Sequence, residues 1–121
     1  MRKMSASIDF VMVLIFVTIG RSAHDHGVKL AGVVSTTWPF GVGLAVGWLT
    51  LLVRKRTGTS LIDGLTVCSA TVFMGMVLRV ASGQGTAVAF IFVALAFLGA
   101  MMIGWRALFA WLQRARRFRH A

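Results

Sequence analysis

The chain has 121 residues, which limits it to a single domain. Hydrophobic residues make up 58% of it, and a soluble domain of this size has too little interior to bury so much apolar surface. The net charge is +10, and the basic residues form short clusters between long apolar segments, which favours anionic lipid headgroups over nucleic acid as the partner.

Four apolar segments follow one another, and each is long enough, or nearly long enough, to cross a bilayer as a helix. The bilayer core offers no water to backbone N–H and C=O groups, so such segments must be helical. The expected fold is an all-α membrane protein, a bundle of four transmembrane helices in one domain. The sequence predicts helices over residues 5–21, 28–53, 61–81 and 86–112, followed by a short basic C-terminal tail over 113–121.

The first predicted helix follows two basic residues, as the apolar core of a signal peptide does, but Asp9 interrupts that core. We therefore expect this segment to be retained as a membrane helix, with Asp9 near its start and Arg21 at its end. Ionisable residues at membrane depth are costly, so both are candidate functional residues. The following His24-Asp25-His26 offers two metal ligands without a convincing third, so the sequence predicts no metal site.

The second predicted helix contains Pro39, which removes one backbone hydrogen bond and is expected to break and bend the helix there. Gly43 and Gly47 then form a face of small residues that lets another helix approach closely. We expect this face to serve packing within the bundle. Two alternatives are a hinge in a transport path and a surface that docks a partner.

The third predicted helix begins with Ser60 as its N-cap and Asp63 in its first turn. Arg106 lies near the end of the fourth membrane segment, on the same side of the membrane. The simplest expectation is an inner ion pair that fixes helix register, between Arg106 and either Asp9 or Asp63. A carboxylate that binds a proton or a cation for transport is the alternative.

The three connections between the apolar segments are short, so sequential helices are expected to be antiparallel neighbours. The positive-inside rule then places both termini in the cytoplasm. Ten of the 13 basic residues fall on the cytoplasmic side in this arrangement: Arg2, Lys3, Arg54, Lys55, Arg56, Arg106, Arg114, Arg116, Arg117 and Arg119. The expected location is a cell membrane, with multiple passes.

On the outer side, the same arrangement brings together Arg21, His24 and Arg79. Guanidinium groups grip phosphate or carboxylate in a bidentate fashion, so these residues are candidates for an outer anion or lipid site. The alternative is that the arginines only reach out to lipid phosphates.

Several short motifs resemble a family of small prokaryotic membrane proteins grouped as domain of unknown function 3054. The elements that carry the resemblance run from about Ile8 to Arg106: Asp9, Gly20-Arg21, His24, Trp38-Pro39-Phe40, Leu78-Arg79 and Gly104-Trp105-Arg106. The resemblance implies a four-helix membrane protein of bacteria or archaea, with no assigned activity.

No arrangement of catalytic residues is evident, so we expect no enzyme and no cofactor. The leading hypothesis is a membrane protein that binds or transports a small anionic solute or lipid. The alternative is a non-catalytic accessory or assembly subunit of a larger membrane complex. Expected partners are the lipid bilayer, with anionic lipids at the cytoplasmic face, and either further copies of the chain or another membrane protein. Nucleic acid is not expected.

Overall fold

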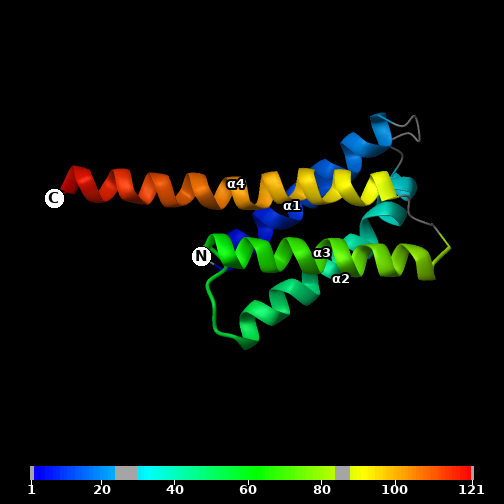
Figure 1. Cartoon of the computed structure of the whole chain (residues 1–121), viewed down its shortest axis with the longest axis horizontal. Coiled ribbons are helices and arrows are strands. Elements are labelled where there is room, and N and C mark those ends of the chain that lie inside the picture. The colour runs from blue at the N-terminus through cyan, green and yellow to red at the C-terminus, as the bar shows by residue number, and fades with distance from the viewer. Residues whose placement is uncertain (1, 24–29, 84–87, 121) are drawn as a thin grey trace.

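A computed structural model describes residues 2–23, 30–83 and 88–120. These residues form four helices: α1 (Arg2–Ala23), α2 (Leu30–Val53), α3 (Leu61–Ala81) and α4 (Val88–His120) (Figure 1). The predicted all-α, four-helix fold is therefore confirmed.

The bounds of α1, α2 and α4 differ from the predicted ones by two or three residues, and two larger differences concern the end of α4 and the middle of α2. Helix α4 continues through most of the region expected to be a separate tail, as far as His120. Arginine, alanine and glutamine are good helix formers, so the change from apolar to basic residues does not end the helix. Helix α2 also runs through Pro39 without a break, against expectation, because neighbouring helices in a membrane bundle support a helix that has lost one backbone bond.

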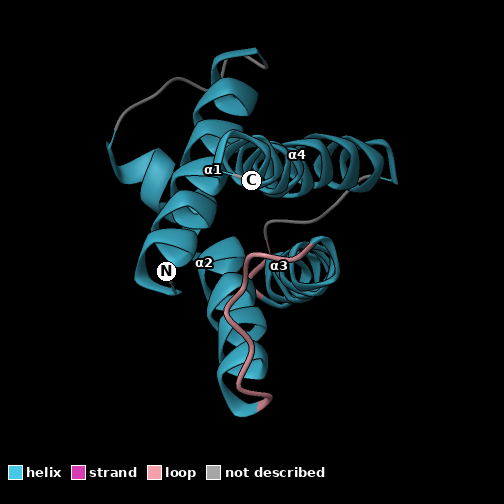
Figure 2. Cartoon of the chain, turned by 90° about the vertical axis from the view of Figure 1, so that its left-hand side faces the viewer, coloured by secondary structure: helices cyan, strands magenta, loops and turns pink. Residues whose placement is uncertain are grey.

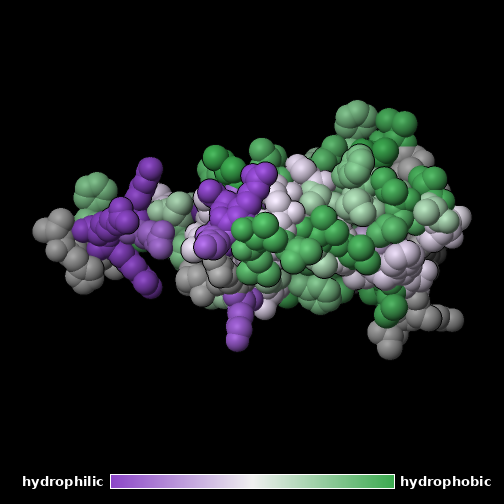
Figure 3. Space-filling model, turned by 90° about the horizontal axis from the view of Figure 1, so that it is seen from below, coloured by the Kyte–Doolittle hydropathy of each residue, from purple (hydrophilic) through white to green (hydrophobic). Residues whose placement is uncertain are grey.

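Each helix contains a segment long and apolar enough to cross a membrane. Large hydrophobic side chains point away from the bundle on every helix, among them Phe73 at 69% exposed and Phe92 at 68%. Figure 3 shows this hydrophobic surface over one half of the molecule, with hydrophilic side chains gathered over the other half. Exposed apolar surface on this scale marks contact with lipid, so the chain is a multi-pass membrane protein.

The closest helix packing is between α2 and α3, at the two glycines of α2. A methyl group on Gly43 would lie 2.7 Å from the backbone oxygen of Thr71, and one on Gly47 would lie 3.0 Å from the Cα of Val67. The small-residue face is thus covered by α3 of the same chain. It serves packing, as expected, and is not available to dock a partner.

Phenylalanine rings fill the middle of the bundle. The ring of Phe16 on α1 meets that of Phe40 on α2 edge to face, with centroids 5.6 Å apart, and lies 5.5 Å from that of Phe97 on α4. Such aromatic contacts add to the stability gained by packing alone. This apolar core separates the two ends of the bundle, where the ionisable side chains lie.

One end of the molecule collects the start of α1, the connection 54–60 and the C-terminal part of α4, and is called the basic end below (Figure 1). Figure 2 looks along the bundle from that side and shows the loop 54–60 running between the ends of α2 and α3. The end of α3 and the start of α4 lie at the opposite end.

Candidate functional site

The carboxylate of Asp9 is fully buried on α1, at the basic end. Its Oδ1 accepts hydrogen bonds from Nε1 of Trp105 at 3.0 Å and from Nη1 of Arg106 at 2.9 Å. Its Oδ2 accepts from Nε1 of Trp48 at 3.0 Å and from Nη2 of Arg106 at 2.7 Å. With four donors from two other helices, the buried negative charge is fully satisfied.

The guanidinium of Arg106 is equally buried, and each of its nitrogens donates a hydrogen bond. Besides its two bonds to Asp9, it donates from Nε to the carbonyl oxygen of Gly58 at 2.7 Å and from Nη1 to that of Met102 at 3.0 Å. It also lies 4.5 Å from the ring centroid of Trp105. A bidentate pair with these extra partners offsets the large cost of taking two charges out of water.

Gly58 connects this ion pair to a second one. Its carbonyl accepts from Arg106, while its N–H donates to Oδ2 of Asp63 at 3.1 Å. The other oxygen of Asp63 accepts from Nε of Arg56, and the backbone N–H of Asp63 donates to the N-cap hydroxyl of Ser60 at 3.0 Å. The backbone of Gly58 therefore ties the loop between α2 and α3 to both ion pairs, directly to Asp63 and through Arg106 to Asp9.

Only glycine suits the position of Gly58. Its φ is +86°, a value that side chains disfavour, and a methyl group there would lie 2.3 Å from the ring of Trp48. The indole of Trp48 thus has two roles, since its ring packs against Gly58 of the loop and its N–H donates to Asp9. We call Asp9, Trp48, Gly58, Trp105 and Arg106 the polar cluster.

The polar cluster contains both residues that sequence analysis named as the inner ion pair, Asp9 and Arg106. Of the two acids considered for Arg106, Asp9 is the partner, and Asp63 pairs with Arg56 instead. Trp48 and Gly58 were not singled out from the sequence. A buried tryptophan in an apolar helix needs a hydrogen-bond partner for its indole N–H, and this requirement is the one signal in the sequence that could have identified Trp48.

At the opposite end, Arg79 lies in the last turn of α3. Its side chain is partly buried, and its guanidinium lies over the ring of Phe90 on α4, 4.9 Å from the centroid. Arg21 is part of α1, but its side chain is outside the described part of the structure, and so is all of His24. Of the predicted outer site, the structure therefore places the Arg79 side chain alone.

Among the described residues, no three His, Cys, Asp or Glu side chains gather as a metal site would require. The pair His24 and His26 lies outside those residues.

Comparison with known proteins gives one match. The model of a family described as "Protein of unknown function (DUF3054)" matches residues 6–109, a region that contains the whole polar cluster and Arg79. No curated protein and no solved structure matches the chain.

Proposed function

The chain belongs to the DUF3054 family of proteins of unknown function, and we propose that it is a non-enzymatic membrane protein that binds or moves a small anionic solute or lipid. The position of Arg79 carries this proposal. Its guanidinium is held partly out of water against the ring of Phe90, at the end of the bundle away from the polar cluster. A cation in that setting interacts with an anion more strongly than one in bulk water does.

Arg79 lies at the end of the bundle away from the polar cluster. The two described carboxylates, Asp9 and Asp63, are both held in ion pairs at the basic end. Arg79 follows Asp63 by 16 residues in the same helix, a separation of about 24 Å at 1.5 Å per residue. Arg21, near the end of α1, and His24, which follows that helix in the sequence, are proposed to complete the anion site.

We propose that the basic end faces the cytoplasm of a prokaryotic cell, with the protein in the plasma membrane. The positive-inside rule supports this orientation, because the N-terminus, the loop 54–60 and the C-terminal part of α4 carry most of the basic residues. In this orientation sequential helices are antiparallel and both termini are cytoplasmic. The site at Arg79 then faces outward.

The polar cluster closes the inner end in this scheme. Asp9 and Arg106 join α1 to α4, and Gly58 adds the loop between α2 and α3, so the cytoplasmic ends of the helices cannot separate without breaking buried hydrogen bonds. If the protein transports its ligand, this pair must part in each cycle. Pro39, within α2 and outside the polar cluster, is the proposed hinge.

Purified protein in liposomes tests this function. Efflux of chloride, phosphate and acetate is followed, together with the change in unfolding temperature that each anion causes. The wild type should release, or be stabilised by, at least one of these anions. Arg79→Gln should lose that response while remaining folded, and Arg79→Lys should keep part of it. Loss of one charge-assisted hydrogen bond corresponds to about 10- to 100-fold weaker binding.

Two results count against this proposal. One is a wild type that responds to none of the three anions and retains no anionic lipid. The other is an Arg79→Gln variant whose only change is a less stable fold, which would make Arg79 a packing residue.

The accessory-subunit alternative loses its expected docking surface, because α3 covers Gly43 and Gly47. A heterologous membrane partner would have to bind a lipid-facing surface of the bundle instead.

A further inference from the structure

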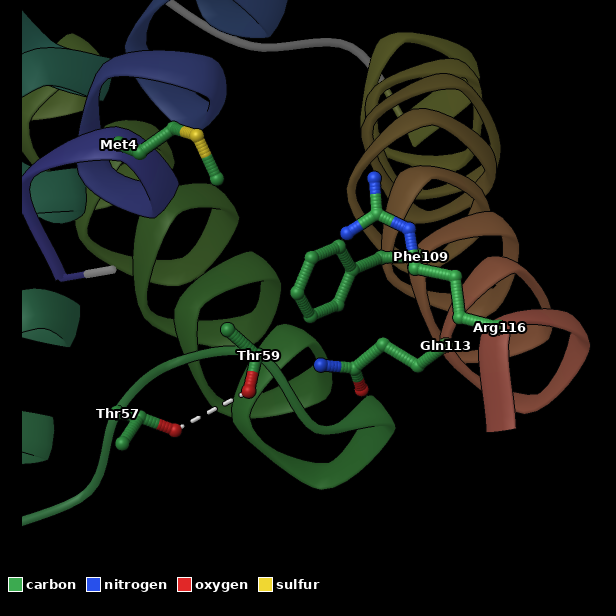
Figure 4. A pocket seen from close by; sticks show the side chains of 6 residues that line it. All are labelled: Met4, Thr57, Thr59, Phe109, Gln113 and Arg116. Atoms are coloured by element: carbon green, nitrogen blue, oxygen red, sulfur yellow. Dashed lines mark hydrogen bonds between the residues drawn. The ribbon is translucent and has the colours of Figure 1, made fainter. Parts of the chain in front are cut away.

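A hollow of about 430 Å³ opens at the basic end, beside the polar cluster. It is lined by Met4 of α1, by Thr57 and Thr59 of the loop, and by Phe109, Gln113 and Arg116 of α4 (Figure 4). Pockets of this size hold ligands as large as a phosphorylated headgroup.

The three lining residues of α4 lie on the same side of the helix as its buried residues but are more exposed: Phe109 is partly buried, and Gln113 and Arg116 are exposed. Ala94, Leu98, Met102 and Arg106 are all fully buried, at a spacing of four residues that keeps them on one side of the helix. Phe109, Gln113 and Arg116 extend the same row at spacings of three and four. This side of α4 thus changes from buried to exposed, and from mainly apolar to mainly polar, where the hollow begins.

The polar groups in the hollow are donors. The hydroxyls of Thr57 and Thr59 share one hydrogen bond at 3.1 Å, which uses one of their two hydrogens and leaves the other able to donate. The amide of Gln113 reaches toward Thr59, and Arg116 lies on the same side of α4 as Phe109 (Figure 4). A guanidinium, an amide and hydroxyls of this kind suit an anion, and the guanidinium in particular suits phosphate.

Two features of the hollow favour a lipid as its ligand: its apolar lining and its position along α4. Met4 and Phe109 offer a hydrophobic wall next to the donors. Phe109 and Arg116 lie about 5 and 15 Å beyond Arg106 along α4, at 1.5 Å per residue. Four arginines follow within the same stretch, Arg114, Arg116, Arg117 and Arg119, as is typical where a helix leaves the hydrocarbon core for the headgroups.

We propose that this hollow is a binding site for the phosphate of an anionic lipid headgroup, with Arg116 and Gln113 as the principal donors and Thr57 and Thr59 as the loop contacts. Thr57 and Thr59 flank Gly58, whose carbonyl accepts from Arg106. A bound headgroup therefore also holds the loop against the polar cluster. The site is independent of the proposed function, because it lies at the end away from Arg79 and uses other residues.

The experiment measures unfolding temperature in neutral detergent micelles against three probes: dihexanoyl phosphatidic acid, dihexanoyl phosphatidylcholine and inorganic phosphate. A ligand that binds only the folded protein raises this temperature with concentration. The pocket variants are Arg116→Gln and Gln113→Ala. The matched control is Arg117→Gln, which removes the same charge from the next residue; Arg117 is exposed like Arg116 but does not line the hollow.

Phosphatidic acid should stabilise the wild type and Arg117→Gln, whereas Arg116→Gln should need about tenfold more lipid for the same shift. Phosphatidylcholine should have little effect. If inorganic phosphate stabilises the wild type as well as the lipid does, the phosphate site stands and its ligand is soluble. If Arg116→Gln and Arg117→Gln lost the stabilisation by phosphatidic acid equally, the site would be overturned, because the lipid would then respond only to the total charge of the protein. A wild type that none of the probes stabilises would overturn it too.

Discussion

Asp9 and Arg106, separated by 97 residues in the chain, form a bidentate ion pair in which both side chains are fully buried. The pair joins the first helix to the last, and two tryptophans and the carbonyls of Gly58 and Met102 satisfy its remaining groups. A buried pair of this kind contributes less to stability than its Coulomb energy suggests. Removing one partner is nevertheless costly, because the other charge stays buried without a counter-charge.

The first prediction follows from that asymmetry. Arg106→Gln should lower the free energy of unfolding by about 3–5 kcal/mol, because the Asp9 carboxylate would remain buried without its cation. Unfolding in mixed micelles with increasing denaturing detergent measures the change. Arg54→Gln, at an exposed position, is the control and should change little. The double variant Asp9→Asn with Arg106→Gln should lose less free energy of unfolding than the sum of the losses in the two single variants. Strictly additive losses would contradict an energetic coupling between Asp9 and Arg106.

A second prediction concerns the two described glycines with positive φ that lie between helices. Gly58→Ala introduces backbone strain and also a contact with Trp48 at 2.3 Å, whereas Gly83→Ala, at φ +81°, meets nothing within 4 Å. Gly83→Ala should therefore cost only the strain of a left-handed conformation, about 1–2 kcal/mol. Gly58→Ala should cost clearly more, measured in the same unfolding assay. Similar costs for the two variants would mean that Trp48 does not support the loop.

The third prediction tests the packing of α2 against α3. Gly43→Ala should destabilise the bundle, because the added methyl group would lie 2.7 Å from a backbone oxygen that cannot move aside easily. Gly41→Ala, two residues earlier, meets nothing within 4 Å and should be neutral or slightly stabilising, since alanine favours helix. If Gly43→Ala instead left stability unchanged and released a bound protein from the native membrane, the glycine face would be an intermolecular surface after all.

A fourth prediction separates the donors to Asp9. Trp105→Phe removes one indole N–H from Oδ1 and should cost about 1–3 kcal/mol, as expected for a buried acceptor that loses a partner. Trp111→Phe is the control, because that ring is 63% exposed on the same helix. Equal thermal stability of the two variants would show that the bond from Trp105 adds nothing.

The sequence specified the helices better than the contacts between them. Apolar length and the N-cap Ser60 predicted α3 over residues 61–81, and α3 has those bounds. The end of α4 was predicted too early, because the polarity that ends a membrane segment does not end a helix. Periodicity and composition act within one segment, and these are the features that a single sequence displays.

The partners of the polar groups depend on how segments pack, which the sequence does not display. The cost of a buried charge identified Asp9 and Arg106 as candidates, but from the sequence either Asp9 or Asp63 could pair with Arg106. The position of the loop 54–60, which brings Arg56 to Asp63, decides the pairing. Gly58 looked like an ordinary turn residue, and its roles come from a tryptophan ten residues earlier and an arginine in another helix.

The central functional claim is that the protein holds an anion through Arg79, and native mass spectrometry of protein extracted gently from its own membrane tests it most directly. We expect the wild type to retain a small anion or an anionic lipid, and Arg79→Gln to lose that bound mass, while Arg54→Gln keeps it. A wild type that carries no such mass, or a stoichiometric complex with a different protein that is unchanged by Arg79→Gln, would contradict the claim.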